Sequence, residues 1–415
     1  MHSLNCCHNG YRRFWEIQLA GEVLILEHFV GDAIDGGDAV WNAVPDSVFD
    51  LRSSLLAWYD LNRRDLPWRH TDDPYAIWVS EIMLQQTRVA AVIERYEIFV
   101  RNFPNVESLA NASEEDVLTL WSGLGYYRRA RMLHKAAKVV VRDHFGKMPH
   151  TAAGLRELPG IGAYTSAAIA SIAFGEAVAV VDGNVERVVQ RLAGWGSDSR
   201  AGQSKLIRET EKLANTLLDP DRPGDFNQSM MELGATVCLP SSPKCLTCPI
   251  SRFCKTRGEH PAPKRARMRS QDAAYALVIR NSEASCETGG EVLLDQRNDD
   301  ETVMPGMWEL PALRDMDVAA ADVSLALRHS IMQVNYYVRI RRVFEDDAEA
   351  LTVPSERRRW IALNQFARIP LTGLTRKVLL RAKLPELKPD LQVLESDTVS
   401  MRKSWSASGL ADARC

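Results

Sequence analysis

Helical periodicity dominates the chain from Asp46 to residue 237. In SVFDLRSSLLAWYDL, apolar residues recur every three or four positions, which places them on one face of a helix. SEEDVLTLWSGL adds a helix start, since Ser113 is a good N-cap residue and acidic residues fill the first turn. The same periodicity continues through RARMLHKAAKVVVRDHF, YTSAAIASIAF, NVERVVQRLAGW and SKLIRETEKLANTLL. We therefore predict that residues 46–237 are all-helical.

The pattern changes to short strands after residue 272. AYALVIR, EVLLDQR, NYYVRIRRVF and RRRWIAL are rich in β-branched and aromatic residues and are separated by Gly, Asp and Asn turns. They predict a second domain over residues 273–384. Strands make up most of it as far as residue 362, and TRKVLLRAKL predicts a closing helix.

The segments that flank these two regions show no such pattern. TRGEHPAPKRARMRSQD is rich in Pro, Lys and Arg, and we interpret residues 259–272 as a basic linker. Residues 1–45 are interpreted as an N-terminal extension, with turns in DAIDGGDAVWNAVPDS. Residues 385–415 are predicted to form a disordered tail.

Composition places the chain among ordinary globular proteins. Its 415 residues are 46% apolar and 25% charged, which is enough for at least two separate cores. A net charge of −3 neither favours nor excludes a nucleic-acid partner, because a basic surface can be local. The apolar stretch IQLAGEVLILEHFV is interrupted by Glu22, Glu27 and His28 and is too short to span a bilayer. We therefore expect no membrane span, no secretory signal and a cytoplasmic protein.

Four of the eight cysteines gather in CLPSSPKCLTCPISRFC, with six, two and five residues between them. In a reducing compartment such a cluster is more typical of a metal site than of disulfides. Zinc sites usually contain two C-x2-C pairs, and only Cys245 and Cys248 form one here. Together with Cys238 and Cys254 they can instead supply four thiolates to a [4Fe–4S] cluster. The others are interpreted as ordinary free thiols: Cys6, Cys7, Cys286 and Cys415.

LPGIGAYT, residues 158–165, predicts a hairpin that leads directly into a helix. Its turn and the helix N-terminus would present backbone N–H groups together, as phosphate binding requires. The missing side chains at Gly160 and Gly162 would let a DNA backbone approach closely. The alternative is a plain glycine turn between two helices.

Two carboxylates are candidates for catalysis. Asp182 follows an apolar run and precedes a helix, so it either caps that helix or supports a developing cation in a partly dry pocket. Glu81 lies among apolar neighbours in IWVSEIMLQQT, where desolvation would raise its pKa and make it a proton donor near neutral pH. A solvent-facing Glu81 is the alternative. Gln86 and Thr87 follow as polar groups that could contact base edges.

Together these motifs resemble a known family. The C-x6-C-x2-C-x5-C cluster, preceded by LPGIG and VDGNV, is similar to the endonuclease III branch of the helix-hairpin-helix DNA glycosylases. SEIMLQQT, GLGYYRRAR and VDGNVERV narrow the resemblance to adenine DNA glycosylases of the MutY type, over about residues 50–375. The resemblance implies a mainly α helix-hairpin-helix glycosylase domain at 46–258, with a [4Fe–4S] cluster loop at 238–254. An α+β Nudix-like domain would follow at 273–384.

The resemblance also implies roles for individual residues. It makes Glu81 the proton donor to adenine N7, Asp182 the stabiliser of an oxocarbenium ion, and Asn184 a residue that positions the site. Tyr164 stands where bifunctional relatives have a Schiff-base lysine, and a phenol cannot form that imine, so a monofunctional hydrolase is implied. The residues expected around the DNA are Arg69, Gln86, Thr87, Leu124, Tyr126, Gly160 and Gly162, with Gln86 and Tyr126 as wedges in the base stack.

The implied substrate is double-stranded DNA with adenine opposite 8-oxoguanine or guanine. The resemblance further implies a monomer that works on the nucleoid of a prokaryotic-type cell. LLDQR and MPGMWELP are similar to the domain that reads 8-oxoguanine, but the family's Phe-Ser-His loop is not evident at 331–333 or, in a shifted register, at 327–329. Trp308, in the second of these motifs, is interpreted as a core residue.

Three other functions fit parts of the sequence. An endonuclease III-like glycosylase and lyase is opposed by Tyr164 and by the added C-terminal domain. A non-catalytic iron–sulfur DNA-binding module would not need Glu81 and Asp182. A Nudix pyrophosphohydrolase would need a helix of metal-binding glutamates, and ALRDMDVAAADVSLAL contains no Glu.

Overall fold

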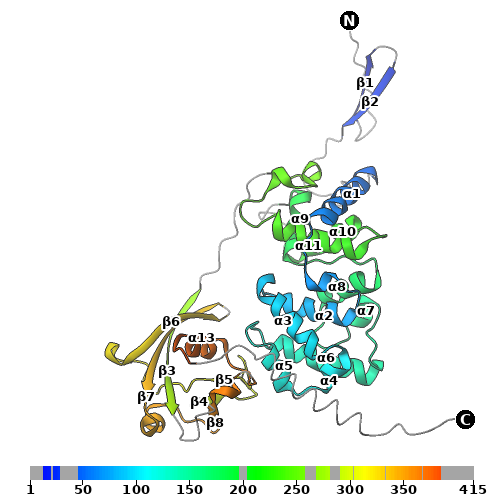
Figure 1. Cartoon of the computed structure of the whole chain (residues 1–415). Helices are drawn as coiled ribbons and strands as arrows, with labels where there is room; N and C mark the ends of the chain where they lie inside the picture. The colour runs from blue at the N-terminus through cyan, green and yellow to red at the C-terminus, as the bar shows by residue number, and fades with distance from the viewer. Residues whose placement is uncertain are drawn as a thin grey trace, which may run out of the picture. The chain divides into compact units, whose positions relative to one another are not determined.

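The computed structural model describes residues 13–19, 22–28, 45–195, 203–257, 268–280, 290–301, 303–331, 333–366 and 368–384 (Figure 1). The chain divides into two compact units, residues 1–51 and 52–415. Within the first unit, strands β1 (Arg13–Leu19) and β2 (Glu22–His28) form an antiparallel pair.

Helices account for the regular structure between residues 45 and 236, as the periodicity predicts. A short 3-10 helix, η1 (Pro67–Arg69), lies between two of these helices. Two more, η2 (Cys245–Thr247) and η3 (Ser251–Phe253), follow residue 236. The helices are α1 (Pro45–Asn62), α2 (Pro74–Leu84), α3 (Val89–Asn102), α4 (Val106–Asn111), α5 (Glu114–Leu120), α6 (Arg128–His144), α7 (Ala152–Leu155), α8 (Ala163–Phe174), α9 (Gly183–Ala193), α10 (Gln203–Leu217) and α11 (Pro223–Thr236). Helix α8 packs against both α2 and α11, so it connects two groups of helices.

The largest hydrophobic core lies among α2 to α8. Its fully buried rings include Trp78, Phe99 and Trp121, and the last two meet edge to face with centroids 5.9 Å apart. Helix α2 begins where the Asp73 side chain accepts a hydrogen bond from the Tyr75 N–H, with proline at the first helical position. It buries nine of its eleven residues. A polar side chain on this helix is therefore enclosed by apolar neighbours.

The C-terminal region is a mixed sheet with helices beside it. The strand order is β5-β4-β3-β7-β6, and β8 pairs with β4. Strands β3 and β7 run parallel, whereas the other pairs are antiparallel, and a tight hairpin joins β6 to β7 with Ile331 opposite Val334. The elements are β3 (Arg269–Arg280), β4 (Glu291–Gln296), β5 (Trp308–Glu309), β6 (Val323–Ile331), β7 (Val334–Val343), α12 (Ala348–Leu351), β8 (Arg358–Ala362) and α13 (Gly373–Arg381).

Two expectations for this region need correction. Strand β3 begins at Arg269, so the last four residues of the predicted linker, 269–272, belong to a strand that pairs with β7. Strand β6 was not among the predicted strands. Among the described strands it pairs with β7, and its exposed positions, such as Arg328, alternate with less exposed ones. Trp308 is buried in the sheet core, as predicted.

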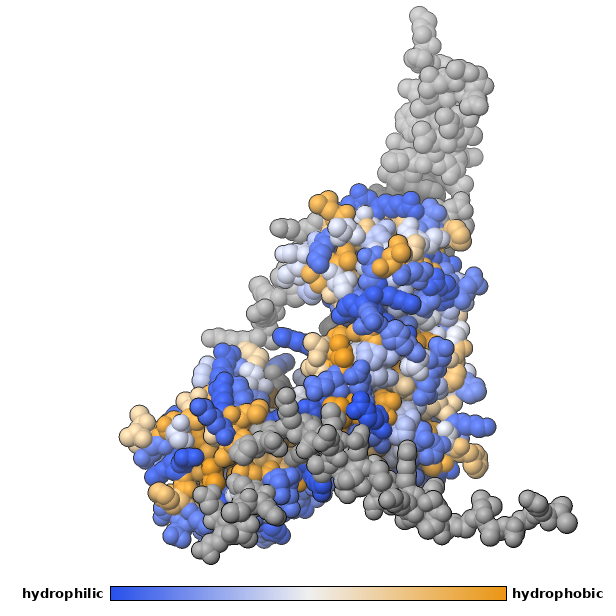
Figure 2. Space-filling model, viewed as in Figure 1, coloured by the Kyte–Doolittle hydropathy of each residue, from blue (hydrophilic) through white to orange (hydrophobic). Residues whose placement is uncertain are grey.

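Several expectations lie outside the described residues. They are the turns at 32–44, the rest of the basic linker at 259–267, the tail at 385–415 and the four cysteines Cys6, Cys7, Cys286 and Cys415. Over the described residues, hydrophilic side chains cover most of the helical surface on the face in Figure 2, and hydrophobic ones form smaller separate areas. None of the described helices combines the length and the apolar character needed to cross a membrane.

Candidate active site

Glu81 is a buried carboxyl group near the C-terminal end of α2. Its side chain has apolar neighbours in the helix and the residue is 5% exposed, so the solvent-facing alternative is excluded. Burial raises the pKa of Glu81 to about 7; the hydrogen bond from Tyr164 and the charge of Arg69 act in the opposite direction, and Asp182 adds to the rise. The expectation of a raised pKa is confirmed, and near neutral pH this carboxyl can hold a proton.

Tyr164 provides the hydroxyl that faces this carboxyl. It lies in the first turn of α8, and its OH donates to Glu81 Oε2 over 2.6 Å and approaches the sulfur of Met231 at 3.6 Å. Burial and the neighbouring carboxyl hold the pKa of Tyr164 well above its ordinary value, so the phenol stays protonated. The three side chains come from α2, α8 and α11, which converge at this point.

The hairpin before α8 depends on a glycine at residue 160. Gly160 has φ of +78°, and a Cβ there would stand 2.6 Å from Met132 Cβ, so both the backbone and the space exclude a side chain. Gly162 is the N-cap residue of α8 and faces open space. The predicted hairpin is therefore present, and the N-terminal end of α8 is accessible on its outer side.

Asp182 is the N-cap residue of α9. Its Oδ1 accepts hydrogen bonds from the N–H groups of Asn184 at 2.9 Å and Val185 at 2.7 Å. Its Oδ2 accepts from the Asn184 side chain at 2.8 Å. The capping interpretation is confirmed, but it does not exclude a second role, since the carboxylate is close enough to Glu81 to influence its pKa.

A second buried carboxylate lies on α11 next to the site. Glu232 is 1% exposed and binds Arg64 at 2.7 Å and Arg69 at 2.9 Å. Burial alone would raise the pKa of Glu232, but the two guanidinium groups outweigh it and the net shift is downward. The Arg69 side chain is 9% exposed and also lies over the Tyr59 ring. Arg69, expected around the DNA, is thus held inside the protein.

The other residues expected around the DNA lie on two adjacent turns. Gln86 and Thr87 follow α2, and Leu124 and Tyr126 precede α6. Thr87 Oγ1 approaches the Leu124 carbonyl at 3.4 Å, which joins the turns. Gln86 is exposed and Tyr126 is 46% exposed, whereas Leu124 is 5% exposed and packs in the helical core. The Leu124 side chain is therefore not presented on the surface, contrary to expectation.

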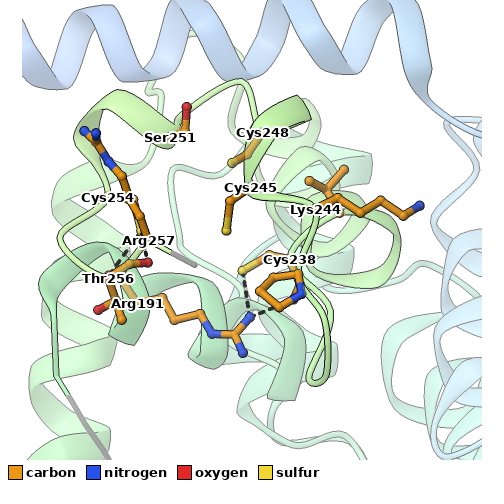
Figure 3. Close-up of a pocket in the computed structure, with 11 residues that line it drawn as sticks. Arg191, Cys238, Lys244, Cys245, Cys248, Ser251, Cys254, Thr256 and Arg257 are labelled. Carbon is orange, nitrogen blue, oxygen red and sulfur yellow. Dashed lines mark hydrogen bonds between the residues drawn. The ribbon is translucent and has the colours of Figure 1, made fainter. Parts of the chain in front are cut away.

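The four clustered cysteines surround one cavity (Figure 3). The cavity is partly open to solvent, and Arg191, Lys244 and Arg257 also contribute to its walls. No disulfide joins the cysteines. Arg191 Nη1 donates to Cys238 Sγ at 3.3 Å. Burial raises the pKa of the Cys248 thiol to about 11, and the other three cysteines add to that rise.

The donor set suits an all-cysteine cluster. No His, Asp or Glu is among the residues that line the cavity, and each of the four sequence-predicted cysteines is present. Within the described residues, no three His, Cys, Asp or Glu side chains are placed as ligands of a single metal ion. A cube carries iron at four corners, so its ligands stand around a larger body than one ion.

Arg187 connects this loop to the cap of α9. Its guanidinium donates to the Cys238 carbonyl at 2.8 Å, to Asn184 Oδ1 at 3.0 Å and to the Gly234 carbonyl at 2.7 Å. Asn184 in turn donates to Asp182. The sequence analysis did not identify Arg187, Arg64 or Glu232, because each contacts partners that are distant in the chain.

Comparison with known proteins fits this geometry. Residues 79–215 match the HhH-GPD superfamily of base excision DNA repair proteins. The human adenine DNA glycosylase is 50% identical over 216 residues, 50% of this chain and 39% of the human protein. The mouse adenine DNA glycosylase is 35% identical over 399 residues, 79% of this chain and 77% of the mouse protein. A solved thermostable thymine-DNA glycosylase is 34% identical, covers 50% of this chain and 95% of its own, and superposes with a TM-score of 0.46.

The hairpin at Gly160, the helices around it and the family match define a helix-hairpin-helix protein of base excision DNA repair. The alignment with the human relative spans less than half of that protein, whereas the mouse alignment spans more than two thirds. On this basis the chain belongs to the adenine DNA glycosylases, a family of DNA N-glycosylases in the hydrolase class.

Proposed function

We propose that the protein removes adenine from double-stranded DNA in which adenine is mispaired with 8-oxoguanine or guanine. The observation that carries the proposal is the buried Glu81 carboxyl, whose pKa is raised to about 7 and whose Oε2 accepts a hydrogen bond from Tyr164. The names of the human and mouse relatives support the choice of adenine.

Glu81 serves as the general acid in this proposal. Adenine leaves slowly as an anion, so the carboxyl proton moves to N7 of the flipped base while the C1′–N9 bond breaks and its electron pair departs with adenine. A buried carboxyl with a pKa near 7 is protonated often enough at neutral pH for this step. General acid catalysis of this kind contributes about 100- to 10,000-fold to the rate.

Asp182 stabilises the cation that remains on the sugar. Its carboxylate is fixed by the α9 N–H groups and by Asn184, so little reorganisation is needed when positive charge develops. Water then adds to C1′, and the proton that it releases returns to a carboxylate of the site. The products are adenine and an abasic sugar in an otherwise intact strand.

The hairpin and the two exposed turns bind the DNA in this proposal. N–H groups at the start of α8 and the open space beside Gly162 suit a phosphate. Gln86 and Tyr126 are exposed and enter the base stack, which offsets the few kcal/mol needed to unstack the flipped base. Because its substrate is DNA, we propose that the enzyme is located at the chromosome, in the nucleoid of a prokaryotic-type cell.

Cys238, Cys245, Cys248 and Cys254 hold a [4Fe–4S] cluster in this proposal. The 6-2-5 spacing supports this choice over zinc, whereas a set of four thiols suits either metal site. Bound as thiolates, the four residues would fix the 238–254 loop. Lys244, in the cavity wall, would then have a defined place beside the DNA phosphates.

We propose that residues 46–258 form a glycosylase domain. Residues 269–384 form a Nudix-like domain that recognises 8-oxoguanine in this proposal. The mixed sheet with α13 beside it supports the second assignment. The β6–β7 hairpin, with Ile331 and Gln333 at its turn, replaces the usual reading loop. We propose that the enzyme acts as a monomer.

The test is excision from duplexes with adenine opposite 8-oxoguanine, guanine or thymine, using full-length protein and alkali to reveal abasic sites. Excision of adenine from both mispairs and not from the thymine duplex is expected. Glu81→Gln serves as the matched control, because it keeps the shape of the side chain and removes the acid. Removal of another base, or full activity of Glu81→Gln, would overturn the proposal.

A further inference from the structure

The guanidinium group of Arg129, in the first turn of α6, joins two turns that are about forty residues apart in the chain. Its two terminal nitrogens donate to six acceptors: Nη1 to the carbonyls of Ile82 at 2.7 Å, Met83 at 3.0 Å and Gln85, and Nη2 to Thr87 Oγ1 at 3.0 Å, the Leu124 carbonyl at 3.3 Å and the Gly125 carbonyl at 3.2 Å. These acceptors lie at the end of α2 and in the turn before α6.

The residues next to these acceptors have unfavourable backbone geometry. Gln86 has φ of +56° and Tyr126 has φ of +48°, the left-handed region that non-glycine residues seldom adopt. Gln86 lies between two acceptors, Gln85 and Thr87, and Tyr126 directly follows a third, Gly125. The same guanidinium therefore holds the chain beside both strained residues, and both of them are exposed.

Arg129 is charged and has no acidic partner in the part of the chain that the structure describes. Burial lowers its pKa to about 10, and Tyr126 is the group that counteracts the shift, so the side chain stays protonated at neutral pH. Its carbon CZ lies 5.4 Å from the Trp121 ring centroid and 5.5 Å from that of Tyr126. A half-buried cation without a carboxylate is costly, and here its hydrogen bonds are to backbone carbonyls and one hydroxyl.

We propose that Arg129 is a positioning residue that holds Gln86 and Tyr126 together as one preformed wedge for the DNA base stack. This inference rests on the DNA-binding role proposed above for those two residues. A guanidinium suits this site, because its two NH2 groups carry four N–H bonds and share them among acceptors on both turns. An ammonium has three donors and would reach only part of the set.

The experiment compares Arg129→Met and Arg129→Lys with Arg142→Met in the full-length protein. Arg142 is a control on the same helix, where it is exposed and pairs with the adjacent Asp143. Affinity is measured for a duplex with a non-cleavable 2′-fluoro-adenosine opposite 8-oxoguanine and for the fully paired duplex. Emission from 2-aminopurine beside the target adenine reports unstacking. Gln86→Ala, Tyr126→Ala and the double variants with Arg129→Met complete a set of mutant cycles.

We expect Arg129→Met to lower affinity for the mispaired duplex by about 10- to 100-fold, as misplaced binding groups do, with little change for the paired duplex. Arg129→Lys should lie between Arg129→Met and the wild type. Each double variant should bind the mispaired duplex with the same affinity as the weaker-binding of its two single variants, because both changes remove the same wedge. Should Arg129→Met not fold, Arg129→Lys and its double variants provide the same comparison.

Two results would overturn the proposal: equal losses on both duplexes, or losses that multiply in the double variants. Equal losses would mean that Arg129 contributes to folding or to general DNA binding, and losses that multiply would mean that it acts independently of Gln86 and Tyr126. If Gln86→Ala and Tyr126→Ala bind the mispair normally, the proposed DNA contact is wrong. If they lose affinity while both Arg129 variants do not, only the positioning role is wrong.

Discussion

The Tyr164 hydroxyl and Glu81 Oε2 are 2.6 Å apart, and the phenol is the donor. Because burial keeps the phenol protonated, this bond favours the carboxylate form of Glu81 and limits how far burial can raise its pKa. The pair thus balances two opposing effects and leaves the acid near neutral pH. A lysine at residue 164 would place a cation in the same position and favour the carboxylate more strongly.

The rate of adenine excision should fall as pH rises through about 7, because Glu81 is the acid and its pKa is about 7. Single-turnover rates measured from about pH 5 to about pH 9 test this. Tyr164→Phe removes a bond that lowers the pKa, so the fall should move to higher pH in that variant. A profile that is flat through neutral pH in the wild type contradicts the acid role.

Stability should depend on the same proton. The folded pKa of Glu81 is raised above its ordinary value of 4.5, so the folded protein holds this proton between that pH and about 7. The contribution of Glu81 to the free energy of unfolding is fully present below pH 4.5, and it is lost as the pH rises through about 7. Denaturant midpoints of wild type and Glu81→Gln at several pH values measure it. The wild type should lose stability relative to the variant as pH rises.

Asp182→Asn should separate capping from catalysis. Asparagine caps helices as well as aspartate does, so α9 should persist. Arg187 fixes the orientation of the Asn184 amide, whose NH2 group donates to Asp182. The NH2 group of an asparagine at residue 182 would face that donor, so one hydrogen bond worth about 1 kcal/mol would be lost. Excision should fall much further, by about 100- to 1,000-fold, because the cation loses its counter-charge. A parallel loss of thermal stability and rate would point to capping alone.

Strand cleavage should appear only after treatment with alkali, because Tyr164 cannot form an imine and its hydroxyl is hydrogen-bonded to Glu81. Borohydride trapping during turnover tests this directly and should yield little covalent complex. Tyr164→Lys is the matched variant, since it restores the amine that a lyase needs. Abundant trapped complex in the wild type, lost in Tyr164→Phe, would show that the monofunctional assignment is wrong.

Iron should accompany the four cysteines. Protein purified without oxygen should be brown and absorb near about 400 nm, and Cys248→Ser should remove most of that colour. DNA affinity should fall with it, since the 238–254 loop would lose the group that orders it. Colourless wild-type protein with one equivalent of zinc would contradict the assignment.

The sequence predicted the elements whose causes are local. Apolar periodicity identified the helices from residue 46 onward, and the apolar neighbours of Glu81 in α2 were enough to predict its burial and its raised pKa. The hairpin at Gly160 and the α9 cap at Asp182 were predicted for the same reason, because the residue types that form them stand next to one another.

What the sequence could not show depends on long-range contacts. Glu232 meets Arg69 across 163 residues, and Arg187 meets Cys238 across 51, so no local pattern announces either contact. Arg69 was therefore placed on the DNA side although it is paired internally. Strand β6 differs from these cases: its alternation of exposed and less exposed residues is a local pattern typical of an edge strand, so the sequence does contain the signal for it.

Removal of residues 268–415 should separate the chemistry from recognition of the opposite base. Glu81, Tyr164 and Asp182 all lie before the deletion, and the contacts that hold them come from α2, α8, α9 and α11. The truncated protein should therefore still excise adenine, with single-turnover rates that become nearly equal for the 8-oxoguanine and guanine duplexes. The full-length protein should prefer 8-oxoguanine, though less strongly if the turn at Ile331 and Gln333 offers few contacts to the lesion. Glu81→Gln in both backgrounds is the control, because it must abolish excision whichever base lies opposite. A truncated enzyme that retains the full preference would place lesion recognition in the helical domain.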